Sequence, residues 1–191
     1  MRVLVLTGMP GAGKSTVSNI ARSMGILTVS MGDAVRHELA RRGLESTVQN
    51  FDFLTQELRK ERGPTAVAQL TYEMISELDQ ASIDTLVIDG MRSQSELEAV
   101  RSWPFVDSAT VLAVLSSFSD RFTRLYGRGR AGDPKSLHEL HERDSVELSF
   151  GLGNLIALSD MYLVNDAGLE EFSAAASQKL RAWLSAEAKK A

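Results

Sequence analysis

The sequence predicts an α/β fold in which helices cover both faces of a parallel sheet. Short apolar runs rich in β-branched residues alternate along the chain with segments whose apolar residues recur at helical spacing. The runs lack polar alternation, which is typical of strands buried on both faces, as in a parallel sheet. With 191 residues, 43% of them hydrophobic, the chain is long enough for one domain of this kind.

Five apolar runs are expected to form the strands: residues 3–7, 27–30, 85–90, 109–115 and 161–165. Apolar residues between the first two runs follow helical spacing and predict the first helix. Two helical stripes within residues 31–80 predict a helical insertion, and a third lies near the C-terminus. We interpret the stripes as core packing. Their members are Phe51, Leu54 and Leu58, then Val67, Leu70, Met74 and Leu78, and finally Leu169, Phe172, Ala176, Leu180 and Trp183.

The composition of the chain excludes several classes of structure and of binding partner. No repeat, low-complexity block or linker divides the chain, so residues 1–191 are expected to form a single domain. A formal charge of −4 gives no overall basic field, and no nucleic-acid partner is expected. The absence of cysteine excludes disulfides and thiolate chemistry. Neither a leader nor a membrane-spanning run is visible, so a cytoplasmic location without a membrane partner is expected.

The stretch GMPGAGKS, residues 8–15, joins the first predicted strand to the first predicted helix. It satisfies the pattern G-x-x-x-x-G-K-[ST] in the context that this pattern requires. Glycines allow backbone bends that turn N–H groups towards phosphate oxygens, and the helix start adds about half a positive charge. A chance glycine-rich turn is the alternative. We expect a phosphate-binding loop (P-loop) with nucleotide contacts from Gly8, Gly11, Ala12, Gly13, Lys14, Ser15 and Thr16.

Three side chains near this loop have separate expected roles. Lys14 would reach the β- and γ-phosphates, and the Ser15 hydroxyl would bind Mg²⁺. Thr16 lies either near the α-phosphate or within the first helical turn. Asp89 ends the third predicted strand, where a carboxylate can hold Mg²⁺ directly or through water. An ordinary strand-end turn is the alternative for Asp89.

Charged residues near the ends of the second and third predicted strands are candidates for binding an acceptor. Asp33 and Arg36 lie three residues apart, on one helix face, at the start of the insertion, and Arg92 follows Asp89 in DGMRS. Guanidinium groups bind phosphate bidentately, and acceptors of phosphoryl transfer often carry a phosphate. Ordinary surface charge is the alternative.

A third arginine-rich segment, RFTRLYGRGRAGDP, covers residues 121–134. Arg121, Arg124 and Arg128 share one helix face, Arg130 follows, and glycines flank the turn. A solvated face would normally mix in more acids than the single Asp120. We therefore favour a closing phosphate-binding lid, within residues 121–145, over a simple surface helix. The acids and bases of residues 142–144 receive no role.

These segments carry a family resemblance that runs from residue 1 to about residue 172. SMGDAVR is similar to the start of the acceptor-binding segment of adenylate kinases, which implies acceptor contacts for Asp33 and Arg36. DGMR is similar to their D-G-F-P-R, which implies an acceptor-phosphate contact for Arg92. RLYGRGR resembles the opening of their lid and implies that Arg124 and Arg128 lie near the transferred phosphate.

The chain thus resembles a nucleoside-monophosphate-kinase-like, adenylate-kinase-related group of P-loop proteins. Its segment ALSDMYLVNDAGLEEF resembles the end of dephospho-CoA kinases, which implies that Asn165 borders the adenine. Met31 replaces the threonine of adenylate kinases, the proline is missing from DGMR and the lid is short, so the acceptor stays open.

Together the residues and the resemblance predict a P-loop NTPase fold with sheet order 2-3-1-4-5, an acceptor-binding insertion at 31–80 and a lid at 121–145. The expected function is transfer of phosphate from Mg-ATP to a small molecule, with Lys14, Arg124, Arg128 and Asp33 as catalytic residues. A phosphate acceptor is favoured over a hydroxyl acceptor, for which Asp33 would serve as base. The competing class is a nucleotide-dependent switch without a dedicated acceptor.

Overall fold

The computed structural model describes residues 1–188 of the chain. Five strands of this part form one sheet: β1 (Arg2–Thr7), β2 (Leu27–Ser30), β3 (Thr85–Asp89), β4 (Ser108–Leu115) and β5 (Met161–Val164). All neighbouring strands are parallel, and their order is β2-β3-β1-β4-β5. The predicted fold class and sheet order are therefore confirmed.

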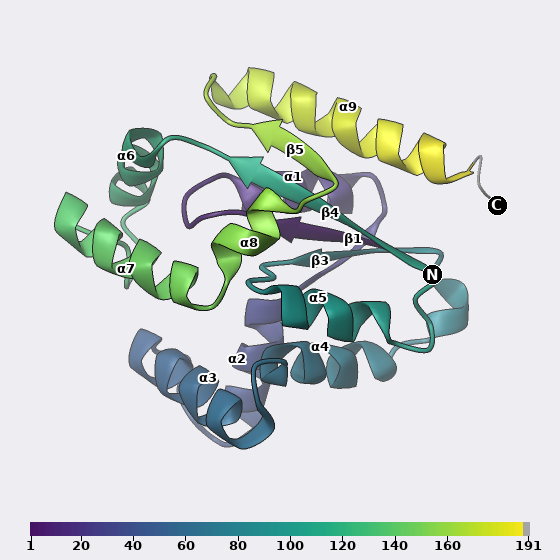
Figure 1. Ribbon diagram of the computed structural model, residues 1–191, viewed down its shortest axis with the longest axis horizontal. Helices are drawn as coiled ribbons and strands as arrows, with labels where there is room; N and C mark the ends of the chain where they lie inside the picture. The colour runs from purple at the N-terminus through teal and green to yellow at the C-terminus, as the bar shows by residue number, and fades with distance from the viewer. Residues whose placement is uncertain (189–191) are drawn as a thin grey trace.

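Helices cover both faces of the sheet (Figure 1). Leu4 and Leu6 of β1 face a core shared with α1 (Lys14–Ser23) and α9 (Leu169–Ala188). Val3 and Val5 face the opposite core, to which five helices contribute: α2 (Met31–Arg41), α3 (Val48–Arg62), α4 (Ala66–Ser76), α5 (Gln94–Arg101) and α8 (Leu152–Ala157). All four β1 side chains are fully buried. Burial on both faces explains why the strands read as unbroken apolar runs.

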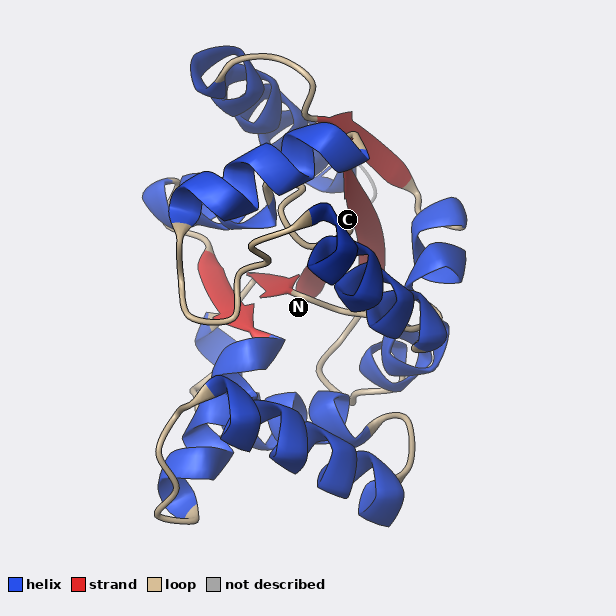
Figure 2. Ribbon diagram, turned by 90° about the vertical axis from the view of Figure 1, so that its left-hand side faces the viewer, coloured by secondary structure: helices blue, strands red, loops and turns tan. Residues whose placement is uncertain are grey.

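The insertion between β2 and β3 contains α2, α3 (Val48–Arg62) and α4, and in Figure 2 these helices lie below the sheet. Two side-chain caps fix where the first two helices begin. Ser30 Oγ accepts a hydrogen bond from the backbone N–H of Gly32, and Thr47 Oγ1 accepts one from that of Asn50. Because each cap satisfies a free N–H at a helix start, the serine and threonine set the helix register.

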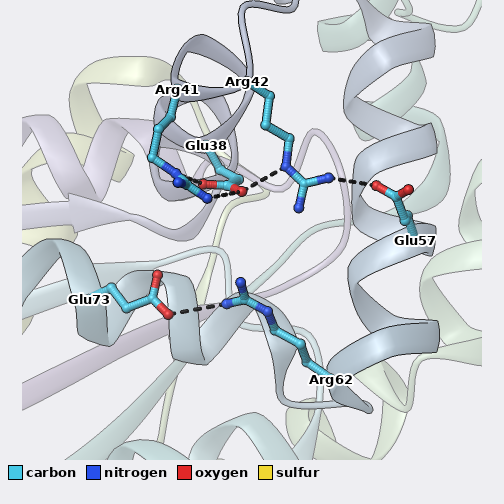
Figure 3. A network of polar contacts seen from close by, with 6 residues as sticks. All are labelled: Glu38, Arg41, Arg42, Glu57, Arg62 and Glu73. Carbon is cyan, nitrogen blue, oxygen red and sulfur yellow. Dashed lines mark hydrogen bonds and ion pairs between the residues drawn. The ribbon is translucent and has the colours of Figure 1, made fainter.

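Ion pairs join the helices of the insertion (Figure 3). Glu38 of α2 is buried and accepts hydrogen bonds from both Arg41 and Arg42, which lower the pKa of Glu38 to about 2. Arg42 also pairs with Glu57 of α3 at 2.7 Å. The carboxylate of Glu38 thus connects α2 to α3 through the Arg42 guanidinium.

Two helices beyond β4 occupy the predicted lid region: α6 (Phe118–Arg128) and α7 (Leu137–Ser149). Two of the predicted apolar stripes, the second in the insertion and the one at the C-terminus, each include one terminal residue that does not pack in the core. Leu78 lies beyond the end of α4 and is 42% exposed, and Leu169 begins α9 and is 72% exposed. At a helix end the chain leaves the face that packs on the core, so the periodic pattern no longer predicts burial.

Candidate active site

The loop between β1 and α1 has the backbone conformation that its glycines allow. Gly8, Gly11 and Gly13 have φ angles of 138°, 79° and 112°, which L side chains rarely adopt. A Cβ atom at Gly8 would lie 2.3 Å from the carbonyl oxygen of Val114. One at Gly13 would lie 2.4 Å from the Asn165 side-chain nitrogen. The loop therefore requires glycine at these positions both for its bends and for its close packing against β4 and the end of β5.

Lys14 begins α1, and its ammonium group turns back onto the loop. Nζ donates to the carbonyl oxygens of Gly8, at 2.7 Å, and Met9, at 3.2 Å. Burial lowers the pKa of Lys14, while the carboxylates of Asp89 and Glu147 oppose this shift. A half-buried cation whose hydrogen-bond partners within residues 1–188 are two neutral carbonyls gains when phosphate oxygens replace them.

Asp89 lies at the carboxyl end of β3 and accepts a hydrogen bond from Ser18 Oγ of α1 at 2.7 Å. Ser15 is exposed one turn before Ser18. In the described part of the chain no three His, Cys, Asp or Glu side chains are grouped as a metal site. A single carboxylate beside a hydroxyl fits Mg²⁺, which in phosphate sites keeps several waters and few protein ligands.

Asn165 follows β5 and contacts the P-loop directly. Its side-chain nitrogen donates to the Ala12 carbonyl at 2.8 Å. Arg124 of α6 donates to the Asn165 carbonyl at 2.9 Å and to Ser116 Oγ at 2.7 Å. The structure thus places Arg124 beside the loop after β5, where it connects α6 to the P-loop through Asn165.

Arg121, the first residue of the arginine-rich face, is buried rather than exposed. It makes two hydrogen bonds to Asp144 of α7, at 2.9 and 2.6 Å, and a third to the Pro10 carbonyl at 3.1 Å. Asp144, to which the sequence assigned no role, is therefore the partner that joins α7 to α6. Since Arg121 also binds the P-loop backbone, its pairing fixes the base of the predicted lid.

The tip of the predicted lid is held by a carboxylate. Asp133 accepts hydrogen bonds from the Arg128 guanidinium, at 2.9 Å, and from the Arg130 backbone N–H, also at 2.9 Å. The hydrogen bond to Arg128 lowers the pKa of Asp133. A Cβ atom at Gly132 would lie 2.9 Å from Val48, so the tip rests against the start of α3. The lid region therefore meets the insertion across the site.

Of the residues predicted to bind an acceptor, Arg92 lines a cavity of about 30 Å³ between the insertion and β3. Asp33 and Arg36 form an ion pair at 2.6 Å on α2, with more than half of each side chain exposed. Asp33 directly follows Gly32, which lines the same cavity, and a Cβ atom at Gly32 would lie 3.4 Å from the Arg36 guanidinium. The structure thus places Arg92 inside the cavity and the Asp33–Arg36 pair at its margin.

Sequence reasoning missed three residues that line or border this cavity: Arg59 of α3, Glu96 of α5 and Glu147 of α7. Glu96 had a readable signal, because Ser93 and Glu96 form the S-x-x-E pattern of a helix start, and the Ser93 side chain indeed accepts from the Glu96 N–H. Arg59 and Glu147 had none, since they reach the cavity from segments distant in sequence.

Comparison with known proteins places the chain in a family. A family model described as an AAA domain matches residues 7–141. The UPF0200 protein of Hyperthermus butylicus is 45% identical over 178 residues, which cover 93% of this chain and 92% of that protein. The chain belongs to the UPF0200 family. A second UPF0200 protein, from Thermococcus onnurineus, is 43% identical over 170 residues, which cover 89% of this chain and 91% of the relative.

The fold of this UPF0200 chain is shared with solved kinases. A gluconokinase from Sinorhizobium meliloti aligns with 99% of this chain, and 97% of its own, at a TM-score of 0.57 and 18% identity. The shikimate kinase from Bacteroides thetaiotaomicron aligns with 97% of this chain, and 98% of its own, at a TM-score of 0.58 and 16% identity. At these identities the likeness establishes a P-loop kinase-like fold. No helix within residues 1–188 of this UPF0200 chain is long and apolar enough to span a membrane.

Proposed function

We propose that this protein transfers the terminal phosphate of Mg-ATP to a small phosphorylated molecule, in the manner of nucleoside monophosphate kinases. The observation that carries the proposal is the meeting of two sites. Lys14 and the P-loop lie at one side, and the cavity that Arg92 lines lies at the other. Glu147 connects them, because it pairs with Arg92 at 3.2 Å and lies near enough to Lys14 to oppose the lowering of its pKa by burial.

On the donor side, the P-loop backbone holds the phosphates and Lys14 exchanges its two carbonyl partners for phosphate oxygens. Ser15 and Asp89 would hold Mg²⁺, which when bound neutralises charge on the donor phosphates. Asn165 would border the adenine, and Arg124, which donates to the Asn165 carbonyl, would lie near the transferred phosphate. Asn, Gln or backbone groups beside a bound base orient it by shape and hydrogen bonds. The hydrogen bond from Asn165 to the Ala12 carbonyl, which holds Asn165 against the P-loop, supports this role for Asn165.

On the acceptor side, Arg92 would bind the acceptor phosphate, with Asp33 and Arg36 at the margin orienting the rest of the molecule. Arg128 would exchange Asp133 for the moving phosphoryl group when the lid closes. A phosphate acceptor is largely dianionic at neutral pH, because its second pKa is about 6, and it needs no base. Catalysis would then rest on positioning and electrostatic stabilisation.

An acceptor screen tests the proposal. Purified protein with Mg-ATP is offered nucleoside monophosphates, dephospho-CoA and other phosphorylated metabolites, and ADP release is compared with the rate without acceptor. We expect at least one phosphorylated compound to raise the rate well above that baseline. A rate that no compound raises would favour the competing class, a nucleotide-dependent switch.

A further inference from the structure

Two arginines that line the cavity, from different parts of the chain, lie near one aromatic ring, that of Phe150. The guanidinium carbon of Arg59 lies 4.2 Å from the centre of the Phe150 ring, and that of Arg92 lies 5.9 Å from it. Arg59 comes from α3, Arg92 from the loop after β3, and Phe150 follows α7. A ring face attracts guanidinium groups and restricts their orientation. The two like charges are thus brought to the same place.

Each arginine is also held by a buried carboxylate. Glu147 contacts Arg92 through Nε, at 3.2 Å, which leaves the outer edge of that guanidinium for other partners. Glu96 lies 3.8 Å from Arg59 and accepts a hydrogen bond from the Arg92 backbone at 2.8 Å. Both carboxylates are at least nine-tenths buried, so neither arginine is held by a loosely solvated partner. The two arginine side chains are therefore held in place before any ligand binds.

One donor of this pair has no partner. Arg59 Nη1 is buried and makes no hydrogen bond to any residue among the first 188. Burial lowers the pKa of Arg59, with the Glu96 carboxylate opposing this shift and the like charge of Arg92 adding to it. A buried charged donor without an acceptor costs free energy, and such groups occur mainly where a ligand or a function requires them.

We propose that Arg59 and Arg92 together form the binding site for the phosphate of the acceptor. This inference rests on the proposed function and names the residues of its acceptor site, with Arg59 in the place that the sequence assigned to Arg36. Two guanidiniums present paired N–H donors that match phosphate oxygens. The apolar lining, which includes Met31, Phe51 and Val67, would take an uncharged part of the same molecule.

Inorganic phosphate is a suitable probe, provided that the P-loop is first filled with the non-hydrolysable Mg-AMPPNP. Calorimetry would then record phosphate binding to the second site. We expect Arg59→Gln to weaken phosphate binding about tenfold or more, the factor that a hydrogen bond to a charged group supplies. The affinity for Mg-AMPPNP should stay unchanged, which also shows that the variant is folded.

Arg62→Gln is the matched control. Arg62 lies on the same helix and pairs with Glu73 of α4 (Figure 3), and it does not line the cavity. We expect it to bind phosphate as the natural protein does. If Arg59→Gln does not fold, Arg59→Lys decides instead, because it keeps the charge but lacks the second N–H donor of the fork.

Equal phosphate affinity in the natural protein and the folded Arg59 variant would overturn the inference. So would the absence of phosphate binding to the natural protein saturated with Mg-AMPPNP. Failure of the natural protein to bind Mg-AMPPNP at all is a separate result, and it would contradict the proposed function itself.

Discussion

Lys14 is a half-buried cation whose ammonium group donates to two backbone carbonyls of its own loop. Its environment favours an incoming anion, because burial disfavours the charged amine and only Asp89 and Glu147 offset that effect. Phosphate oxygens are stronger acceptors for an ammonium group than neutral carbonyls are. The residue is thus poised for ligand exchange.

Replacing Lys14 by alanine should weaken Mg-ATP binding by about 1.5–3 kcal/mol, the worth of a hydrogen bond to a charged group. Isothermal titration calorimetry measures this change. Lys60→Ala is a suitable control, because Lys60 is exposed on α3. Unchanged Mg-ATP affinity and turnover in Lys14→Ala would contradict the proposed role of the P-loop in binding ATP.

Asp33 distinguishes the two chemical classes of acceptor. Its carboxylate pairs with Arg36 on a largely exposed helix face, an arrangement suited to orienting a bound molecule. On the phosphate-acceptor hypothesis, Asp33→Asn should lower turnover about tenfold or less on the true acceptor, through lost orientation. Steady-state kinetics would measure it. A loss of about a thousandfold at unchanged acceptor affinity would identify Asp33 as the general base for a hydroxyl.

Among the elements, helix α7 and the residue after it contact three separate parts of the site, and no sequence motif indicated this role. Asp144 binds Arg121 of α6, Glu147 contacts Arg92 beyond β3, and Phe150 stacks under Arg59 of α3. The C-terminal part of α7 and the residue that follows it therefore position residues from the lid base, the sheet edge and the insertion. A displacement of α7 would change the acceptor cavity and the lid together.

The insertion helices should lose stability in acid because of Glu38. Its folded pKa is about 2, below the ordinary 4.5, so the pairing stabilises the fold above pH 4.5 and is lost as the pH falls towards 2. Glu38→Gln should lower the free energy of unfolding by about 1–2 kcal/mol near neutral pH, with the difference shrinking across that window.

Urea unfolding at pH 7 and at several lower values measures this difference. Glu73→Gln is the control, because Glu73 makes an exposed pair with Arg62, and a change within about 0.5 kcal/mol is expected. A constant difference between Glu38→Gln and the natural protein down to pH 2 would contradict the assigned role of Glu38.

Local patterns predicted most elements of the fold. The strand at 27–30 is observed with the predicted bounds, and the strands at β1, β3, β4 and β5 differ by one residue at an end. These elements could be predicted because the apolar runs and the P-loop are local signals. The pairing of Arg121 with Asp144, and the approach of Arg59 to Phe150, could not, since they depend on tertiary packing of distant segments.

At the scale of the whole molecule, the parallel sheet gathers the candidate site at one edge. The P-loop follows β1, Asp89 ends β3, Ser116 follows β4 and Asn165 follows β5. In parallel α/β sheets ligands bind beyond the carboxyl ends of the strands, because loops of successive strands converge there. The insertion and the lid region flank this edge and meet where Gly132 contacts Val48.

In the proposed reaction, phosphate moves from ATP to a second molecule rather than to water. Phosphorus NMR of a reaction with Mg-ATP and the acceptor found by screening tests it most directly. We expect a new phosphoryl resonance that grows in step with ADP, with little inorganic phosphate, and the loss of this resonance in Lys14→Ala. Inorganic phosphate equal to ADP with every acceptor offered would contradict it.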